Sequence, residues 1–180
     1  RNIVTPLAGT TRDSIYTRFN KFQHDFLLVD TAGLRKKGKV SEDIEFYSVM
    51  RAVRTIENSD ICLLLLDATR GIEAQDLNIM SLIQKNNKGM IVLVNKWDLS
   101  EDASDARRNE VKRMVYASFP HLDFAPILFV SGLTGYRTHQ IFPEIMQAWQ
   151  ARQTVIPPET LADFLASATR EHRPARGKGT

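Results

Sequence analysis

Three short groups of polar and glycine residues are the parts of this sequence best suited to chemistry. They are Asp30-Thr31-Ala32-Gly33, Asn95-Lys96-Trp97-Asp98 and Ser131-Gly132-Leu133. Each group begins where a short apolar run ends, which is where loops leave the strands of a sheet. In an open parallel sheet, ligands bind outside the carboxyl ends of the strands. The three groups are therefore predicted to meet at one edge of a sheet and to form one ligand site.

The elements that must position these groups alternate between short apolar runs and helix-length amphipathic stretches. The runs at 25–30, 61–67, 90–95 and 127–131 are apolar throughout, which is typical of strands covered on both faces. The run at 15–20 alternates instead, and we expect it to pair with 25–30 as a hairpin at an edge. Helices are predicted at about 41–58, 73–88, 103–118 and 138–152. This alternation predicts an α/β fold with a doubly wound, mostly parallel sheet.

Two residues within the second apolar run receive structural interpretations. Asp67 closes that run, and we interpret it as a turn or helix-cap residue rather than a ligand contact. Cys62 lies inside the run and is interpreted as a small core residue. As the only cysteine, it excludes an internal disulfide framework and fits a reducing compartment, so we expect a cytoplasmic location.

Composition excludes several classes of protein. With 43% hydrophobic and 25% charged residues, the 180-residue chain can bury a core and is not disordered over most of its length. Its longest apolar run, at 61–66, is far shorter than the roughly 20 residues of a membrane span, so no membrane association is expected. The formal charge of +3 arises from the segment 170–180, and the remainder is neutral.

Taken together and in this order, the DTAG, NKWD and SGL groups resemble the guanine-nucleotide-binding GTPase fold. In that setting the Asp98 carboxylate can accept two hydrogen bonds from the ring N–H and the exocyclic amine of guanine. Adenine offers neither donor on that edge, so an unpaired carboxylate would reject it. Lys96 can lay its alkyl chain over the base while Asn95 ties neighbouring loops together. The backbone N–H groups of Ser131-Gly132-Leu133 are expected at the guanine oxygen. Trp97 belongs to the predicted GTP-binding segment 95–98, and its side chain is assigned to packing.

The same resemblance implies a phosphate and metal region. Asp30 would lie near Mg²⁺ through a water, and the N–H of Gly33 would face the γ-phosphate, within a nucleotide-binding segment that also holds Thr31, Ala32 and Leu34. The segment TPLAGTTRD at 5–13 looks like the switch I segment of potassium-dependent GTPases. It implies that Thr11 ligates Mg²⁺ and, with Gly33, serves catalysis. Thr5, Leu7 and Thr10 would then lie on a loop that holds a potassium ion.

Two departures bear on hydrolysis. Leu34 stands where many small GTPases place a glutamine that orients the attacking water, and leucine has no group that can do so. The string G-x-x-x-x-G-K-[ST], whose N–H groups and lysine cradle phosphates, does not occur in these residues. We therefore expect the chain to be a piece of a longer protein, with the first strand, phosphate loop and first helix before Arg1, and to be weak or inactive by itself.

The stretch 29–98 resembles one family closely. It contains DTAGLRKK at 30–37, FYSV at 46–49, DA at 67–68, QD at 75–76 and NKWDL at 95–99. This is similar to the second G domain of the bacterial double-GTPase family called EngA or Der, which acts in assembly of the large ribosomal subunit. The resemblance implies a truncated second G domain at 1–152, and the start of a KH-like domain at 153–180. It also implies GTP and GDP as ligands and ribosomal particles or rRNA as partners.

Two hypotheses of different classes follow. The first is an enzyme that hydrolyses GTP to GDP and phosphate and switches its association with ribosomal particles. The second is a nucleotide-inactive scaffold or RNA-binding module. The intact trio Asn95, Lys96 and Asp98 favours the first, because nothing structural requires those three residue types together. An ATP-using enzyme is disfavoured by Asp98.

Overall fold

The computed structural model describes residues 15–21, 23–30, 50 and 52–171. The described residues fall into two compact units, divided between Trp149 and Gln150. In the first unit the strands are β1 (Ile15–Lys21), β2 (His24–Asp30), β3 (Ile61–Asp67), β4 (Gly89–Asn95) and β5 (Ile127–Phe129). Its helices are α2 (Ala74–Lys85), α3 (Asp105–Ser118) and α4 (Ile141–Gln153), the last of which runs into the second unit. The second unit holds α5 (Pro158–Glu171).

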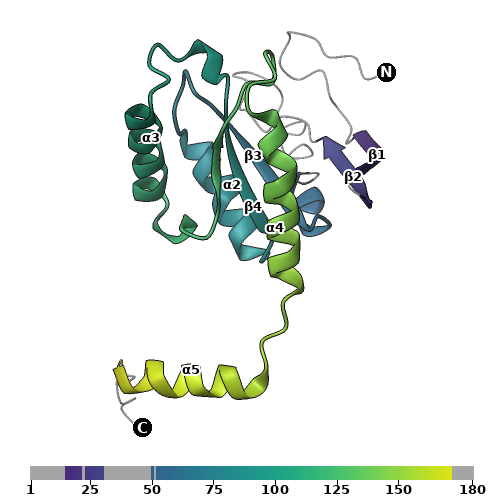
Figure 1. The fold of residues 1–180 in the computed structure, drawn as a ribbon, viewed down its shortest axis with the longest axis vertical. Helices are drawn as coiled ribbons and strands as arrows, with labels where there is room; N and C mark the ends of the chain where they lie inside the picture. The colour runs from purple at the N-terminus through teal and green to yellow at the C-terminus, as the bar shows by residue number, and fades with distance from the viewer. Residues whose placement is uncertain (1–14, 22, 31–49, 51, 172–180) are drawn as a thin grey trace. The chain divides into compact units, whose positions relative to one another are not determined.

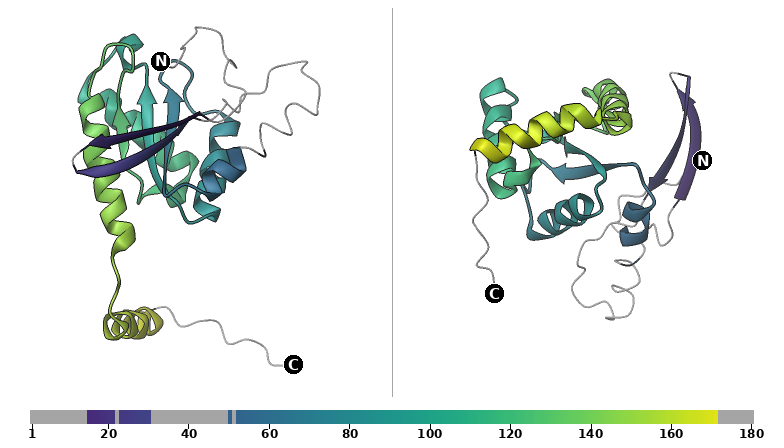
Figure 2. Two further views of the ribbon diagram at one scale, coloured as in Figure 1. Left: turned by 90° about the vertical axis from the view of Figure 1, so that its right-hand side faces the viewer. Right: turned by 90° about the horizontal axis from the view of Figure 1, so that it is seen from below.

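The central sheet has three parallel strands in the order β3-β4-β5. Figure 1 shows the sheet with its helices, and the view from below in Figure 2 shows α2 and α4 on opposite faces of it. Side chains of β4 alternate between two apolar clusters. Met90, Val92 and Val94 pack with residues of α2 and α3, while Ile91 and Leu93 face α4. The predicted doubly wound α/β fold is confirmed by this layering.

The helices begin where the sequence provides caps. At the start of α2 the backbone N–H of Glu73 donates to Asp76 Oδ2 at 2.9 Å, and at α3 the Ser104 hydroxyl accepts from the Arg107 N–H at 3.2 Å. Such side chains satisfy N–H groups that have no partner within the first helical turn. The predicted helices at 73–88, 103–118 and 138–152 are thereby confirmed, each within a few residues at its ends. Of the predicted helix at 41–58, residues 50 and 52–57 are helical and 41–49 and 51 lie outside the described residues.

Strands β1 and β2 form the expected antiparallel hairpin, with Phe19 opposite Phe26 and their rings stacked at 5.2 Å. The expectation that 25–30 and 61–67 are covered on both faces is wrong in part. Leu27 and Leu28 are about half exposed, as is Leu65 on β3. The reason is that, among the described residues, β2 and β3 each have a neighbouring strand on one side only, whereas β4 has two.

The second unit is described by α5 and its approach. Leu161, Phe164 and Leu165 recur at helical spacing along α5 and are exposed. Among the described residues, no helix combines the length and hydrophobicity that crossing a membrane requires.

The buried core gives a direct test of this architecture. Ile83 of α2 is 2% exposed and belongs to the cluster against β4, whereas Met114 of α3 is 45% exposed. Ile83→Ala removes buried methyl groups and leaves a cavity, so we expect the free energy of unfolding to fall by about 2–4 kcal/mol in urea titrations. Met114→Ala serves as the matched control and should change it by less than about 1 kcal/mol. Equal effects of the two substitutions would contradict the assignment of this face of α2 to the core.

Candidate functional site

The structure describes only part of the predicted site. It describes Asp30, the segment 95–98 and the segment 131–133. The remaining predicted residues lie outside the described residues: Thr5, Leu7, Thr10, Thr11, Thr31, Ala32, Gly33 and Leu34. The base-recognition half can therefore be built from contacts, whereas the phosphate half stays a prediction.

Strand register brings the two described loops together. Asp67 at the end of β3 lies opposite Asn95 at the end of β4, and Val94 lies opposite Phe129 on β5. The Asn95 side-chain oxygen accepts a hydrogen bond from the Gly132 N–H at 2.9 Å, across 37 residues of sequence. This bond ties the 95–98 loop to the 131–133 loop, the role expected for Asn95. A Cβ added at Gly132 would lie 3.7 Å from Asn95 Oδ1, an ordinary contact, so alanine would also fit there.

Lys96 has a left-handed backbone conformation, and its side chain forms an ion pair with Asp67. Its φ of 62° lies in the left-handed region, which turns the chain sharply out of β4. Its Nζ donates to Asp67 Oδ2 at 2.7 Å. The Lys96 side chain is 53% exposed while that of Asp67 is 7% exposed. The lysine therefore reaches from solvent onto a buried carboxylate, and Asp67 holds its ammonium group beside the two loops.

Asp67 is the residue of this site that the sequence interpretation missed. Its other carboxylate oxygen, Oδ1, accepts from the backbone N–H of Thr69 at 3.0 Å and from the Thr69 hydroxyl at 2.6 Å. The turn interpretation is therefore correct but incomplete, because the same carboxylate also binds Lys96. Burial acts to raise the pKa of Asp67, but the hydrogen bonds from Lys96 and Thr69 outweigh it and lower the pKa to about 2. The sequence signal for this second role was that Asp67 and Asn95 each end an apolar run, because the ends of parallel strands meet at one edge of the sheet.

The carboxylate of Asp98 is open to a ligand. Asp98 lies in a 3₁₀ turn, Trp97–Leu99, that follows Lys96, and its side chain is exposed. In the part of the chain that the structure describes, it has no hydrogen-bond or ion-pair partner. An exposed, unpaired carboxylate can accept two parallel hydrogen bonds from an incoming ligand, the chemistry expected at this position.

The indole ring of Trp97 takes no part in that surface. The residue is 3% exposed, and its ring packs edge-on against Phe129 at 4.5 Å. Its backbone N–H donates to Val130 O at 3.1 Å. Trp97 therefore anchors the turn from beneath, as the packing assignment expects, and its side chain has no access to a base bound over the loops.

The three N–H groups expected at the guanine oxygen differ in their availability. The N–H of Ser131 donates to Tyr136 O at 3.1 Å, and that of Gly132 donates to Asn95. Both therefore have acceptors within the protein. The N–H of Leu133 has no acceptor among the described residues, and its side chain is 88% exposed. Leu133 is thus the donor that this conformation leaves open to a ligand.

Asp30 ends β2 and is exposed, with no ion-pair or hydrogen-bond partner in the described segments. A solvent-open carboxylate with uncommitted oxygens suits a Mg²⁺ ion, which keeps several waters and takes one or two carboxylates from the protein. The described residues contain no cluster of three or more metal-ligating side chains. Thr11, the other predicted Mg²⁺ ligand, lies outside the described residues.

The Asp67–Lys96 pair yields a prediction about stability. Asp67→Asn removes a buried charge partner, and because Lys96 is half exposed its ammonium can be solvated again. We expect the free energy of unfolding at neutral pH to fall by about 1–2 kcal/mol. Asp105→Asn is the matched control, because Asp105 also forms an ion pair, here with Arg108, but its side chain is 89% exposed. The control should leave stability nearly unchanged in the same urea titrations, because solvent screens an exposed ion pair.

The pH dependence of that difference checks its cause. The pKa of Asp67 is lower in the folded chain, so its stabilisation is complete above the unfolded value of 3.8 and is lost as pH falls through about 2. The stability gap between the natural chain and Asp67→Asn should therefore shrink as the pH is lowered from about 6 to about 2.5. A gap that stays constant over this range would contradict the ion-pair explanation.

Two relatives of the chain are named GTPase Der. The chain is 53% identical over 180 residues to GTPase Der of Bacteroides thetaiotaomicron and 50% identical to GTPase Der of Porphyromonas gingivalis. Each match covers 99% of this chain and 41% of the relative. The chain therefore spans about two-fifths of the length of these relatives.

Solved structures share the fold. Era in complex with MgGDPNP and nucleotides 1506–1542 of 16S ribosomal RNA has a TM-score of 0.69 and 26% identity, with 81% of this chain and 47% of that chain covered. The structure of Aquifex aeolicus Era bound to GDP.AlF4⁻ has the same TM-score and identity, and the match covers 81% of this chain and 48% of that chain. Residues 1–96 match the family described as 50S ribosome-binding GTPase. This chain belongs to that family of 50S ribosome-binding GTPases.

Proposed function

We propose that this chain is the guanine-nucleotide-binding part of a GTPase that hydrolyses GTP to GDP and phosphate. The observation that carries the proposal is the Asn95–Gly132 hydrogen bond, which joins two loops beside the open Asp98 carboxylate. The family and the relatives named GTPase Der support it. So do the Era structures, which contain MgGDPNP and GDP.AlF4⁻.

Each described residue has a distinct role in the proposed base recognition. The Asp98 carboxylate accepts hydrogen bonds from the ring N–H and the exocyclic amine of guanine. The Leu133 N–H donates to the guanine oxygen, and the alkyl chain of Lys96 lies along the base plane while Asp67 holds its ammonium group. Asn95, also assigned to the GTP-binding residues, keeps the two loops together through its bond to the Gly132 N–H. An adenine base would leave the Asp98 carboxylate unpaired, which is the source of discrimination.

The phosphate region is proposed from the sequence. Asp30 and Thr11 would hold Mg²⁺, which supplies positive charge to the phosphates, and the Gly33 N–H would face the γ-phosphate within the segment 30–34. Thr5, Leu7 and Thr10 would hold K⁺, whose charge takes the place of a polarising side chain where Leu34 stands. Electrostatic stabilisation of this kind is the main catalytic term in phosphoryl transfer.

We further propose that the parent protein acts in the cytoplasm in assembly of the large ribosomal subunit, with ribosomal particles or rRNA as partners. The description of the family as ribosome-binding supports this, as does the ribosomal RNA in the Era complex. The segment 153–180, which holds most of the second unit, is proposed as the start of a KH-like domain. Because the sequence contains no G-x-x-x-x-G-K-[ST] string, these 180 residues should bind nucleotide weakly and show no useful turnover. The alternative is a nucleotide-inactive scaffold.

Calorimetric titration of the chain with GDP and with ADP, in Mg²⁺ and K⁺, tests the proposal. We expect weak heat from GDP and none from ADP, because the base loops are assembled without a phosphate loop. No heat of binding with either nucleotide in a folded sample would favour the alternative of a nucleotide-inactive scaffold. Equal binding of both would contradict the guanine assignment.

Substitution at Asp98 tests the base contact itself. Asp98→Asn replaces two acceptors with one acceptor and one donor, so GDP affinity should fall by roughly tenfold or more while xanthosine diphosphate is accepted. Asp102→Asn is a control of equal charge change in the following loop and should leave GDP affinity unchanged. Unaltered preference in Asp98→Asn would show that another residue reads the base.

A further inference from the structure

A polar groove of about 210 Å³ lies along the side of β5 that faces away from β4, where the described residues place no other strand. Three basic side chains and one acidic side chain line it, together with two amides and the strand itself, so its walls carry a net charge of +2. The lining residues are Asp105, Arg108, Asn109, Lys112, Ile127, Leu128, Phe129, Arg137 and Gln140. The proposed nucleotide chemistry uses none of them.

One wall is a single stripe of α3. Asp105, Arg108, Asn109 and Lys112 recur at helical spacing, while Val115 further along α3 belongs to the core. Arg108 is held in place, because its Nε and Nη2 donate to Asp105 Oδ1 at 3.1 and 2.5 Å. Lys112 has no ion-pair partner among the described residues. The wall thus combines one fixed guanidinium with one ammonium that is open to a ligand.

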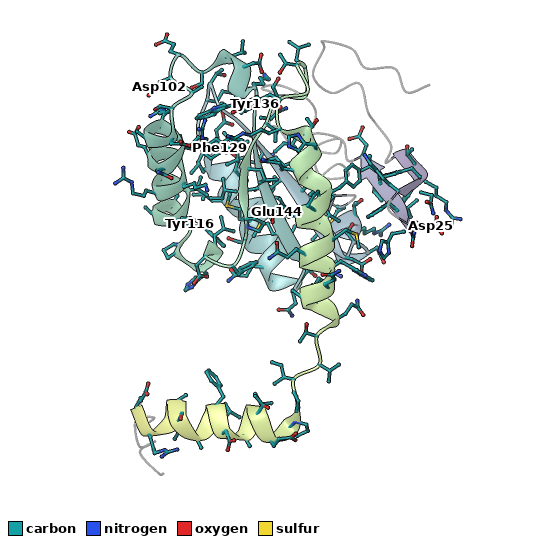
Figure 3. All side chains as sticks on the ribbon, viewed as in Figure 1. Asp25, Asp102, Tyr116, Phe129, Tyr136 and Glu144 are labelled. Carbon is teal, nitrogen blue, oxygen red and sulfur yellow. The ribbon has the colours of Figure 1, made fainter. Side chains whose placement is uncertain are left out.

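The opposite wall begins just after the base loop. Arg137 has a φ of 52°, and its guanidinium carbon lies 5.3 Å from the centre of the Tyr136 ring. Tyr136, labelled in Figure 3 above Phe129, accepts the N–H of Ser131 at 3.1 Å. Arg137 also helps, after Arg108, to lower the pKa of Asp105, so the two walls lie within electrostatic range of each other. The position of Arg137 is therefore fixed by the fold.

The floor is the edge of a strand. Val92 N donates to Pro126 O, and Val130 N donates to Val94 O, so these β5-side groups face β4. In a parallel ladder, successive residues direct their backbone groups to alternate sides. The N–H and C=O groups of Ile127 and Phe129 therefore face the groove, whereas their side chains are buried at 5% and 3% exposure. The floor offers both donors and acceptors.

We infer that this groove binds the sugar-phosphate backbone of single-stranded RNA. Lys112, Arg137 and the outward N–H groups suit the phosphodiester anion, and the outward carbonyls suit a ribose 2′-hydroxyl. A peptide added as a strand is disfavoured, because β5 spans three residues and presents only two of them outward. The choice of RNA as the source of phosphate rests on the proposed ribosomal function, whereas the anion chemistry does not.

Fluorescence anisotropy of a labelled oligouridine of about 12 nucleotides, at about 0.05 M salt, tests the inference with the 180-residue chain. In the double variant Lys112→Gln/Arg137→Gln, affinity should fall by roughly tenfold. The slope of log affinity against log salt should also become shallower by about one. The matched control Lys85→Gln/Arg113→Gln removes the same charge from exposed positions outside the groove, and it should change affinity by less than about twofold. Circular dichroism of each variant verifies folding.

Four outcomes would overturn the inference. The first two are absence of oligouridine binding by the natural chain and an equal loss in the control double variant. The other two are equal displacement of the RNA by poly-glutamate and equal affinity for the deoxy oligonucleotide, which should bind more weakly. GDP titration of the same samples separates the two proposals. RNA binding without GDP binding would support the RNA groove and reject the nucleotide site. GDP binding without RNA binding would support the nucleotide site and reject the RNA groove.

Discussion

Two-sided burial of β4 is the constraint on which the rest of the described site depends. Its residues Met90 to Val94 are each at most 4% exposed and pack alternately toward α2 and α3 or toward α4. Burying five such side chains stabilises the fold by roughly 10 kcal/mol before conformational entropy is counted. A one-residue slip would move each side chain of β4 to the opposite face, so its present contacts with the helices would be lost, and Asn95 would move away from Asp67 and Gly132. The end of β4, and with it Asn95, therefore has a single position in the fold.

From that fixed point the polar groups are placed by short-range geometry. The left-handed Lys96 turns the chain, the buried Trp97 ring anchors the turn on Phe129, and Asp98 is left at the surface. The same register brings Asp67 opposite Asn95. Residues far apart in sequence thus become neighbours because three parallel strands end at one edge. The strand register alone places the loops side by side.

Sequence patterns predicted much of this arrangement, for physical reasons that particular residues illustrate. An apolar run such as 90–95 favours a strand buried on both faces, and polar groups that follow parallel strands gather at one edge of the sheet. The exposure of Leu65 could not be predicted, because an apolar side chain does not reveal whether its strand has one neighbour or two. The second role of Asp67 was missed for a related reason. Its turn chemistry with Thr69 is local, whereas its bond to Lys96 crosses strands.

The hydrogen-bonding state of the SGL loop shows why residue type alone does not define a ligand contact. Ser131, Gly132 and Leu133 each carry an N–H, yet two of these donate to Tyr136 and Asn95. Those internal bonds give the loop its shape, and the remaining donor of Leu133 owes its position to them. In the proposed function, the described half of the site would discriminate between bases, since it offers one open carboxylate and one open N–H. Neither group supplies the charge that phosphates require, so base selectivity and nucleotide affinity would then depend on different segments of the fold.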